Sequence, residues 1–130
     1  MVGMVIVSHS AKVAEGIAEM AAQMARPEQA IIAAGGMADG GIGTDAMRVN
    51  EAICRADGGD GVLIMVDLGS AVLSAETALE FLDAEQQARV RIADAPVLEG
   101  SIAAAVEASL GSDLAKVAQT AEEARNLRKC

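Results

Sequence analysis

The sequence has almost no aromatic residues: it contains one Phe, no Tyr and no Trp in 130 residues. Its core must therefore be built from Val, Ile, Leu, Met and Ala, and no aromatic surface is present on which bases or sugars could stack. The hydrophobic residues, counted as A, V, I, L, M, F, W, Y and C, make up 52% of the chain. A chain this apolar is expected to fold rather than stay disordered, and its length suits a single domain over residues 1–130.

Positive charge is also scarce, because ten Lys and Arg face nineteen Asp and Glu, for a formal net charge of −9. Nucleic acids and anionic membranes bind clusters of Lys and Arg, so this balance excludes both as partners. No apolar run approaches the roughly 18 residues of a membrane span, and no export signal is recognisable at the N-terminus. We therefore expect a soluble, cytoplasmic protein.

Metal-binding and disulfide-forming residues are few. The two cysteines, Cys54 and Cys130, are far apart and belong to no CxxC motif, and His9 is the only histidine. This excludes the common zinc frameworks and gives no indication of a disulfide scaffold. We predict no metal site and a reducing environment.

Short aliphatic runs alternate with stretches of helical periodicity. Strands are predicted at residues 2–8, 30–34, 61–66 and 90–93, and helices at 10–24, 45–56, 70–82, 99–110 and 113–129. Ser10 and Thr44 are predicted to cap the first two helices. Because βαβ units have right-handed crossovers, this alternation predicts an α/β fold. We expect a single-domain sandwich, with a mostly parallel sheet of about four strands and helices on both faces.

Polar residues that could take part in catalysis or binding lie directly after these strands. In such sheets, ligands bind outside the carboxyl ends of the strands, where the strand order reverses. The loops concerned are 8–10, 35–44, 67–70 and 94–96. If the first and third strands are neighbours, His9 lies beside Asp67.

A histidine beside an aspartate suggests phosphoryl transfer. A carboxylate that accepts the Nδ1–H of His9 would fix the tautomer and leave Nε2 free to accept a phosphoryl group. Backbone N–H groups of the helices that begin near Ser10 and Ser70 could bind the phosphate, with Gly69 allowing close approach and the Ser70 hydroxyl as a further donor. A structural histidine flanked by helix-capping serines is the alternative interpretation.

The glycine-rich loop at residues 35–43 permits a second hypothesis. The segment from Gly41 to Ala46 fits the pattern G-x-G-x-x-A of dinucleotide-binding folds. The loop follows the second strand, however, and this length holds only half of such a fold. The glycine-rich segment is explained equally well as a flexible connection that ends at the helix cap Thr44, or as a loop that docks a partner through Gly41 and Thr44. No Walker motif is present, so no ATP site of that type is predicted.

Several segments, in order, resemble one family. They are VIVSHS at 5–10, IGTDA at 42–46, VDLGSA at 66–71, LSAETAL at 73–79 and APVLEG at 95–100. The chain is similar to the phosphocarrier subunit of the phosphoenolpyruvate-dependent dihydroxyacetone kinase, which is related to mannose-type enzyme IIA domains of the sugar phosphotransferase system. The resemblance implies that His9 is phosphorylated on Nε2, that Asp67 binds its other nitrogen, and that the protein forms homodimers.

The resemblance also implies the partners. His9 would take its phosphoryl group from the general histidine-containing phosphocarrier protein and pass it to ADP on a kinase subunit, while a third subunit binds dihydroxyacetone. This chain would bind no cofactor itself, because the phosphoryl group is covalent and ADP or ATP with Mg belongs to the partner. Some members of the family carry fused carrier domains, for which 130 residues leave no room. We therefore expect phosphate to arrive from separate proteins.

Three other functions remain open at this point. A sugar-transport enzyme IIA component of the mannose type would have the same chemistry and a different acceptor. A small nucleotide-binding enzyme would use the loop at Gly41, and an interaction module would have no covalent step at all.

Overall fold

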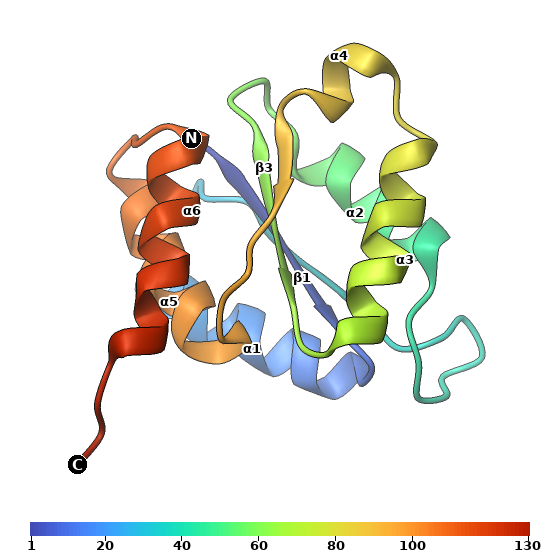
Figure 1. Cartoon of the computed structure of the whole chain (residues 1–130), viewed down its shortest axis with the longest axis horizontal. Helices are drawn as coiled ribbons and strands as arrows, with labels where there is room; N and C mark the ends of the chain where they lie inside the picture. The colour runs from blue at the N-terminus through green and yellow to red at the C-terminus, as the bar shows by residue number, and fades with distance from the viewer.

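The centre of the molecule is a four-stranded, all-parallel sheet with strand order β2-β1-β3-β4 (Figure 1). The computed structural model describes residues 1–130. The strands are β1 (Gly3–Ser8), β2 (Ile31–Gly35), β3 (Val62–Val66) and β4 (Val90–Ile92). The helices are α1 (Ala11–Gln23), α2 (Ala46–Ala56), α3 (Gly69–Glu80), α4 (Ala84–Gln87), α5 (Val97–Ser109) and α6 (Leu114–Glu123), followed by the 3-10 turn η1 (Ala124–Asn126). The predicted α/β fold is confirmed.

Helices cover both faces of the sheet. In Figure 1, α5 and α6 lie to the left of the sheet, and α2 and α3 lie to its right. Alternate residues of β1 enter the two cores: Met4 and Ile6 pack with α1, α5 and α6, whereas Val5 and Val7 pack with α2 and α3. Every residue of β1 and β3 is buried, which explains why these strands are continuous apolar runs without polar alternation.

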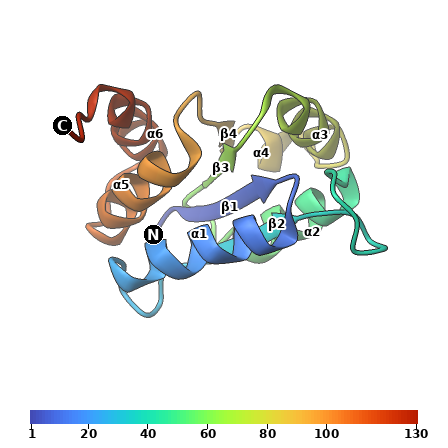
Figure 2. The same ribbon diagram turned by 90° about the horizontal axis from the view of Figure 1, so that it is seen from below.

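The register of the two central strands determines where the polar residues meet. Val7 of β1 pairs with Val66 of β3, so the residues that follow each strand leave the sheet at the same level. In Figure 2, β1 points toward the end of the molecule where α3 begins and where the loop after β2 lies. This end of the sheet is the crevice at which the strand order reverses, because β1 lies between β2 and β3.

Neither Thr44, which was predicted as a cap, nor Ser70 is the N-cap of its helix. Asp45, not Thr44, is the N-cap of α2, and its side chain accepts a hydrogen bond from the Met47 N–H. Helix α3 begins at Gly69 after Leu68, with no side-chain cap, so Ser70 lies inside the first turn. The predicted cap at Ser10 is confirmed, since its hydroxyl accepts from the Val13 N–H. The hydroxyls of Thr44 and Ser70 are thus available for tertiary contacts.

The predicted end of the last helix was wrong, and one short helix was missed. The last helix ends at Glu123 and continues as the turn η1, whereas the sequence predicted helix up to residue 129. The short helix α4 was not predicted, because four residues are too few to show helical periodicity. None of the helices combines the length and the apolar character needed to cross a bilayer.

A buried carboxylate fastens the end of α2 to the segment before β4. The side chain of Asp57 is 4% exposed and forms an ion pair with Arg89 at 2.8 Å. It also accepts hydrogen bonds from the Gln86 side chain and the Gly59 N–H. The hydrogen bonds from Arg89 lower the pKa of Asp57 below its ordinary value, although burial acts to raise it. This network holds α4 and the edge strand against the sheet.

We predict that Asp57→Ala lowers the free energy of unfolding by about 2 kcal/mol, because it leaves Arg89 and Gln86 without their acceptor. Urea unfolding followed by circular dichroism measures this change. Asp60→Ala is the control, since its side chain is 66% exposed and the loss should stay below about 1 kcal/mol. Equal effects of the two variants would contradict the prediction.

The same network predicts a pH dependence. Because the pKa of Asp57 is lowered in the folded protein, its ionised form contributes full stability above its ordinary value of 3.8. That contribution is lost as the pH falls through the lower pKa of the folded state. The difference in stability between wild type and Asp57→Ala should therefore narrow below about pH 4.

Candidate functional site

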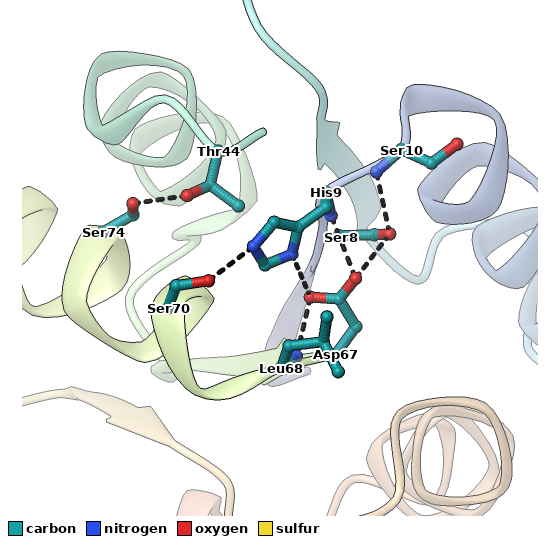
Figure 3. A network of polar contacts seen from close by, with 8 residues as sticks. All are labelled: Ser8, His9, Ser10, Thr44, Asp67, Leu68, Ser70 and Ser74. Atoms are coloured by element: carbon teal, nitrogen blue, oxygen red, sulfur yellow. Dashed lines mark hydrogen bonds and ion pairs between the residues drawn. The ribbon is translucent and has the colours of Figure 1, made fainter. Parts of the chain in front are cut away.

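His9 and Asp67 face each other across the carboxyl ends of β1 and β3 (Figure 3). His9 directly follows β1, and Asp67 directly follows β3. The Nδ1 atom of His9 lies 2.9 Å from Oδ1 of Asp67, and the two side chains are 21% and 17% exposed. The structure thus brings together the two residues that the sequence analysis paired, within reach of solvent.

The Asp67 carboxylate accepts hydrogen bonds from four donors. Its Oδ2 accepts from the Ser8 hydroxyl and from the His9 backbone N–H, both at 2.9 Å. Its Oδ1 faces Nδ1 of His9 at 2.9 Å and accepts from the Leu68 N–H at 2.8 Å. An ionised carboxylate has about four acceptor positions, so these donors occupy all of them. Burial raises the pKa of Asp67, but the hydrogen bonds from His9, Ser8 and Leu68 outweigh it, and the net pKa is lowered.

This arrangement determines the tautomer of His9. An ionised carboxylate can only accept a hydrogen bond, so Nδ1 must carry the proton that it shares with Asp67. In the neutral ring, Nε2 is then unprotonated and keeps its lone pair. The Ser70 hydroxyl lies 2.5 Å from Nε2 and donates to it in this tautomer. The free nitrogen therefore faces outward toward the start of α3.

Helix α3 presents its N-terminus to the ring. Gly69 and Ser70 form its first turn, whose N–H groups have no partner within the helix. A Cβ placed on Gly69 would meet nothing within 4 Å, so the backbone there is open to an approaching group. Backbone N–H donors at such a terminus favour anions. A negative group attached to Nε2 would lie beside them.

Ser10 does not join this arrangement through its side chain. Its hydroxyl accepts from the Val13 N–H, and its backbone N–H donates to the Ser8 hydroxyl. Figure 3 shows the Ser10 side chain pointing away from the imidazole. Both of these bonds serve the start of α1, and the role of Ser10 in phosphate binding, at the N-terminus of this helix, stays a prediction.

The glycine-rich loop is fastened to the site at several points. The Gly36 N–H donates to the Ser8 carbonyl, and the Gly43 N–H donates to the His9 carbonyl at 2.8 Å. Gly36 and Gly43 have positive φ values of 72° and 145°, which explains the need for glycine at these contacts. The Thr44 hydroxyl lies 2.5 Å from that of Ser74 on α3, so the end of the loop is joined to the helix that carries Ser70.

The Gly41 carbonyl accepts a hydrogen bond from the Met37 N–H within this loop, and the loop lacks the geometry of a dinucleotide site. The Gly41 N–H donates to the Asp39 side chain, and Gly41 lines none of the three cavities. Helix α2 begins only at Ala46, whereas β2 ends at Gly35. A dinucleotide fingerprint needs a tight turn from strand to helix, which this long loop does not provide.

The largest cavity lies beside Asp67 rather than over His9. It has a volume of about 490 Å³, and its lining residues include Asp67, Glu76, Ile92 and Asp94. Its ionisable lining groups are carboxylates, which would repel the phosphates of a nucleotide. No cluster of three or more His, Cys, Asp or Glu side chains is arranged to hold a metal ion.

Two residues of the site were missed in the sequence analysis. Ser8 contacts Asp67, and Ser74 contacts Thr44. The signal for Ser8 was a hydroxyl at the end of an otherwise apolar strand, immediately before the histidine. Ser74 had no such signal, because a serine inside a helix usually faces solvent.

Known proteins are similar to this chain in sequence, and one solved structure is similar to it in fold. Residues 3–118 match the model of the family EIIA-man, described as "PTS system fructose IIA component". The chain is 51% identical over 120 residues to DhaM of Escherichia coli K12, named the phosphoryl donor subunit of a PEP-dependent dihydroxyacetone kinase. It is 44% identical over 107 residues to a DhaM protein of Listeria innocua, covering 82% of this chain and 86% of that protein. The chain belongs to the EIIA-man family, among its DhaM members.

The relatives differ in how much of their own length this chain covers. This chain covers 25% of the Escherichia coli protein, although that match spans 90% of this chain. Among solved structures, the crystal structure of EF1359, a protein of unknown function, superposes with a TM-score of 0.82 at 41% identity. That superposition covers 94% of both chains, so the fold described above extends over nearly the whole of that relative.

We predict that Asp67→Asn shifts the tautomer of His9. An amide NH₂ placed opposite Nδ1 turns that nitrogen into an acceptor, so the proton moves to Nε2. The ¹⁵N chemical shifts of the imidazole measure the position of the proton. Glu76→Gln is the matched control, because it also removes one carboxylate on the adjacent cavity and does not contact the ring. If the Asn variant kept its proton on Nδ1, the tautomer would not depend on Asp67.

Proposed function

We propose that this chain is a phosphohistidine carrier whose His9 accepts a phosphoryl group on Nε2. The histidine-containing phosphocarrier protein is the donor, and ADP bound to a dihydroxyacetone kinase subunit is the acceptor. The observation that carries this proposal is the pairing of Nδ1 with Asp67, which leaves a lone pair on the outward nitrogen. Membership among DhaM proteins supports the choice of partners.

The transfer needs no proton movement at the reacting nitrogen. The lone pair of His9 Nε2 attacks phosphorus, and the bond between phosphorus and the donor's nitrogen breaks. The ring becomes cationic while Nδ1 keeps its proton, and the adjacent Asp67 carboxylate stabilises this charge. The Ser70 hydroxyl, which donates to Nε2 before transfer, then donates to the phosphoryl oxygens. In the second transfer, a terminal oxygen of ADP attacks phosphorus and Nε2 regains its lone pair.

Alignment and electrostatics supply most of the catalysis in such reactions. The fixed ring provides the alignment, and the N–H groups at the start of α3 provide positive potential near Nε2. We further propose that residues 1–130 act as one cytoplasmic carrier domain that binds no cofactor of its own and forms a homodimer. Thr44 and Gly41 would belong to its partner-docking loop.

A sugar-transport component is the second candidate, favoured by the description of the matched family as a fructose IIA component. It would use the same His9 and pass the phosphoryl group to a protein of a sugar permease rather than to ADP. Mixing the phosphorylated chain with the ADP-bound kinase subunit distinguishes these two functions. Formation of ATP supports the kinase, and a stable phosphorylated chain supports the transporter.

We predict that His9→Ala abolishes phosphorylation by phosphoenolpyruvate in the presence of the two general proteins of the phosphotransferase system. Intact-mass measurement should show one acid-labile phosphoryl group on the wild-type chain and none on the variant. Ser10→Ala is the control and should still be phosphorylated, because that hydroxyl is turned away from the ring. A phosphorylated His9→Ala chain would disprove the proposal.

The donor and the acceptor should compete for one surface, because each must reach Nε2 in line with the bond that breaks. The His9→Ala chain cannot react and should still bind both partners, so adding the unphosphorylated carrier protein should displace it from the kinase subunit. Analytical gel filtration or fluorescence anisotropy measures this displacement. A stable complex of all three proteins would show two separate docking surfaces.

A further inference from the structure

Ser8 is a buried polar residue at the carboxyl end of the sheet. It is the last residue of β1, and only 1% of its surface is exposed. A buried hydroxyl is costly unless both its donor and its acceptor capacity are used. Here both are used, and one of the two bonds goes to Asp67.

The direction of both hydrogen bonds follows from their partners. The Ser10 backbone N–H can only donate, so the Ser8 oxygen accepts from it at 3.1 Å. The Asp67 carboxylate can only accept when ionised, so the Ser8 O–H donates to Oδ2 at 2.9 Å. The hydroxyl therefore lies between the start of α1 and the carboxylate, in one defined orientation.

This bond controls the rotation of the Asp67 carboxylate. Oδ2 is held by Ser8 and by the His9 N–H, which leaves Oδ1 directed at Nδ1 of the ring. Of the two donors to Oδ2, the backbone N–H cannot be removed by a side-chain change. Ser8 is thus the one side chain, apart from His9 itself, that donates to this carboxylate.

We propose that Ser8 is a positioning residue for phosphoryl transfer: its hydroxyl orients the carboxylate of Asp67, and through it the tautomer and angle of the His9 ring. This inference rests on the proposed function for its kinetic consequence, but not for its effect on the ring. Ser8 does not touch the phosphoryl group, because it lies buried on the far side of Asp67 from Nε2.

The first test is the rate of phosphorylation of Ser8→Ala by the phosphorylated carrier protein. We expect the maximal rate to fall on the order of tenfold, which matches the loss of one hydrogen bond to a charged group. The KM for the carrier protein should stay unchanged, since a buried residue does not meet the partner. Ser101→Ala is a matched control, because Ser101 is also fully buried and its hydroxyl has no hydrogen-bond partner.

The second test needs no phosphoryl donor. In the unphosphorylated Ser8→Ala chain, the ¹⁵N spectrum of His9 should show a mixture of the two tautomers, whereas Ser101→Ala should keep the proton on Nδ1. Ser8→Thr keeps the hydroxyl and suits a strand, so it should restore both the rate and the spectrum. Thermal unfolding of each variant shows whether a lost rate merely follows lost folding.

The outcomes separate the two proposals. A wild-type chain that is never phosphorylated would contradict the proposed function, and the spectra would still decide the role of Ser8. A folded Ser8→Ala chain with the wild-type rate and an unchanged His9 spectrum would overturn the role of Ser8. A folded Ser8→Thr chain as slow as Ser8→Ala would show that packing, and not the hydroxyl, matters at this position.

Discussion

The site depends on one constraint, the saturation of the Asp67 carboxylate by donors. Ser8, the His9 backbone, the His9 ring and the Leu68 backbone each supply one hydrogen bond to it. Because the carboxylate is held from three directions by groups other than the imidazole, the ring has one favourable partner for Nδ1. Whether Nε2 carries a proton is thus decided by the hydrogen bond between Nδ1 and Asp67.

The fold makes this constraint possible by placing two strand ends at the same level. The register that pairs Val7 with Val66 brings residues 8 and 9 opposite residue 67. Apolar residues on both faces of β1 and β3 keep the two strands in the middle of the sheet. The loop after β2 and the start of α3 then close around the histidine, joined by the contact between Thr44 and Ser74.

The sequence was sufficient for the features that arise from strong local patterns. Buried strands are recognisable as runs of β-branched residues, and the placement of His9 and Asp67 after two such strands predicted their meeting. Features that depend on competition between neighbouring groups were not predictable in this way. Thr44 and Asp45 are both good caps, and only the structure shows that Asp45 accepts from the Met47 N–H while Thr44 contacts Ser74.

The decisive experiment identifies the imidazole nitrogen that carries phosphorus. In the phosphorylated chain labelled with ¹⁵N, coupling between ³¹P and the imidazole nitrogens identifies the bonded atom. We expect the phosphoryl group on Nε2 of His9 and a proton on Nδ1. A phosphoryl group on Nδ1 would contradict this expectation, since that nitrogen is the one bonded to Asp67.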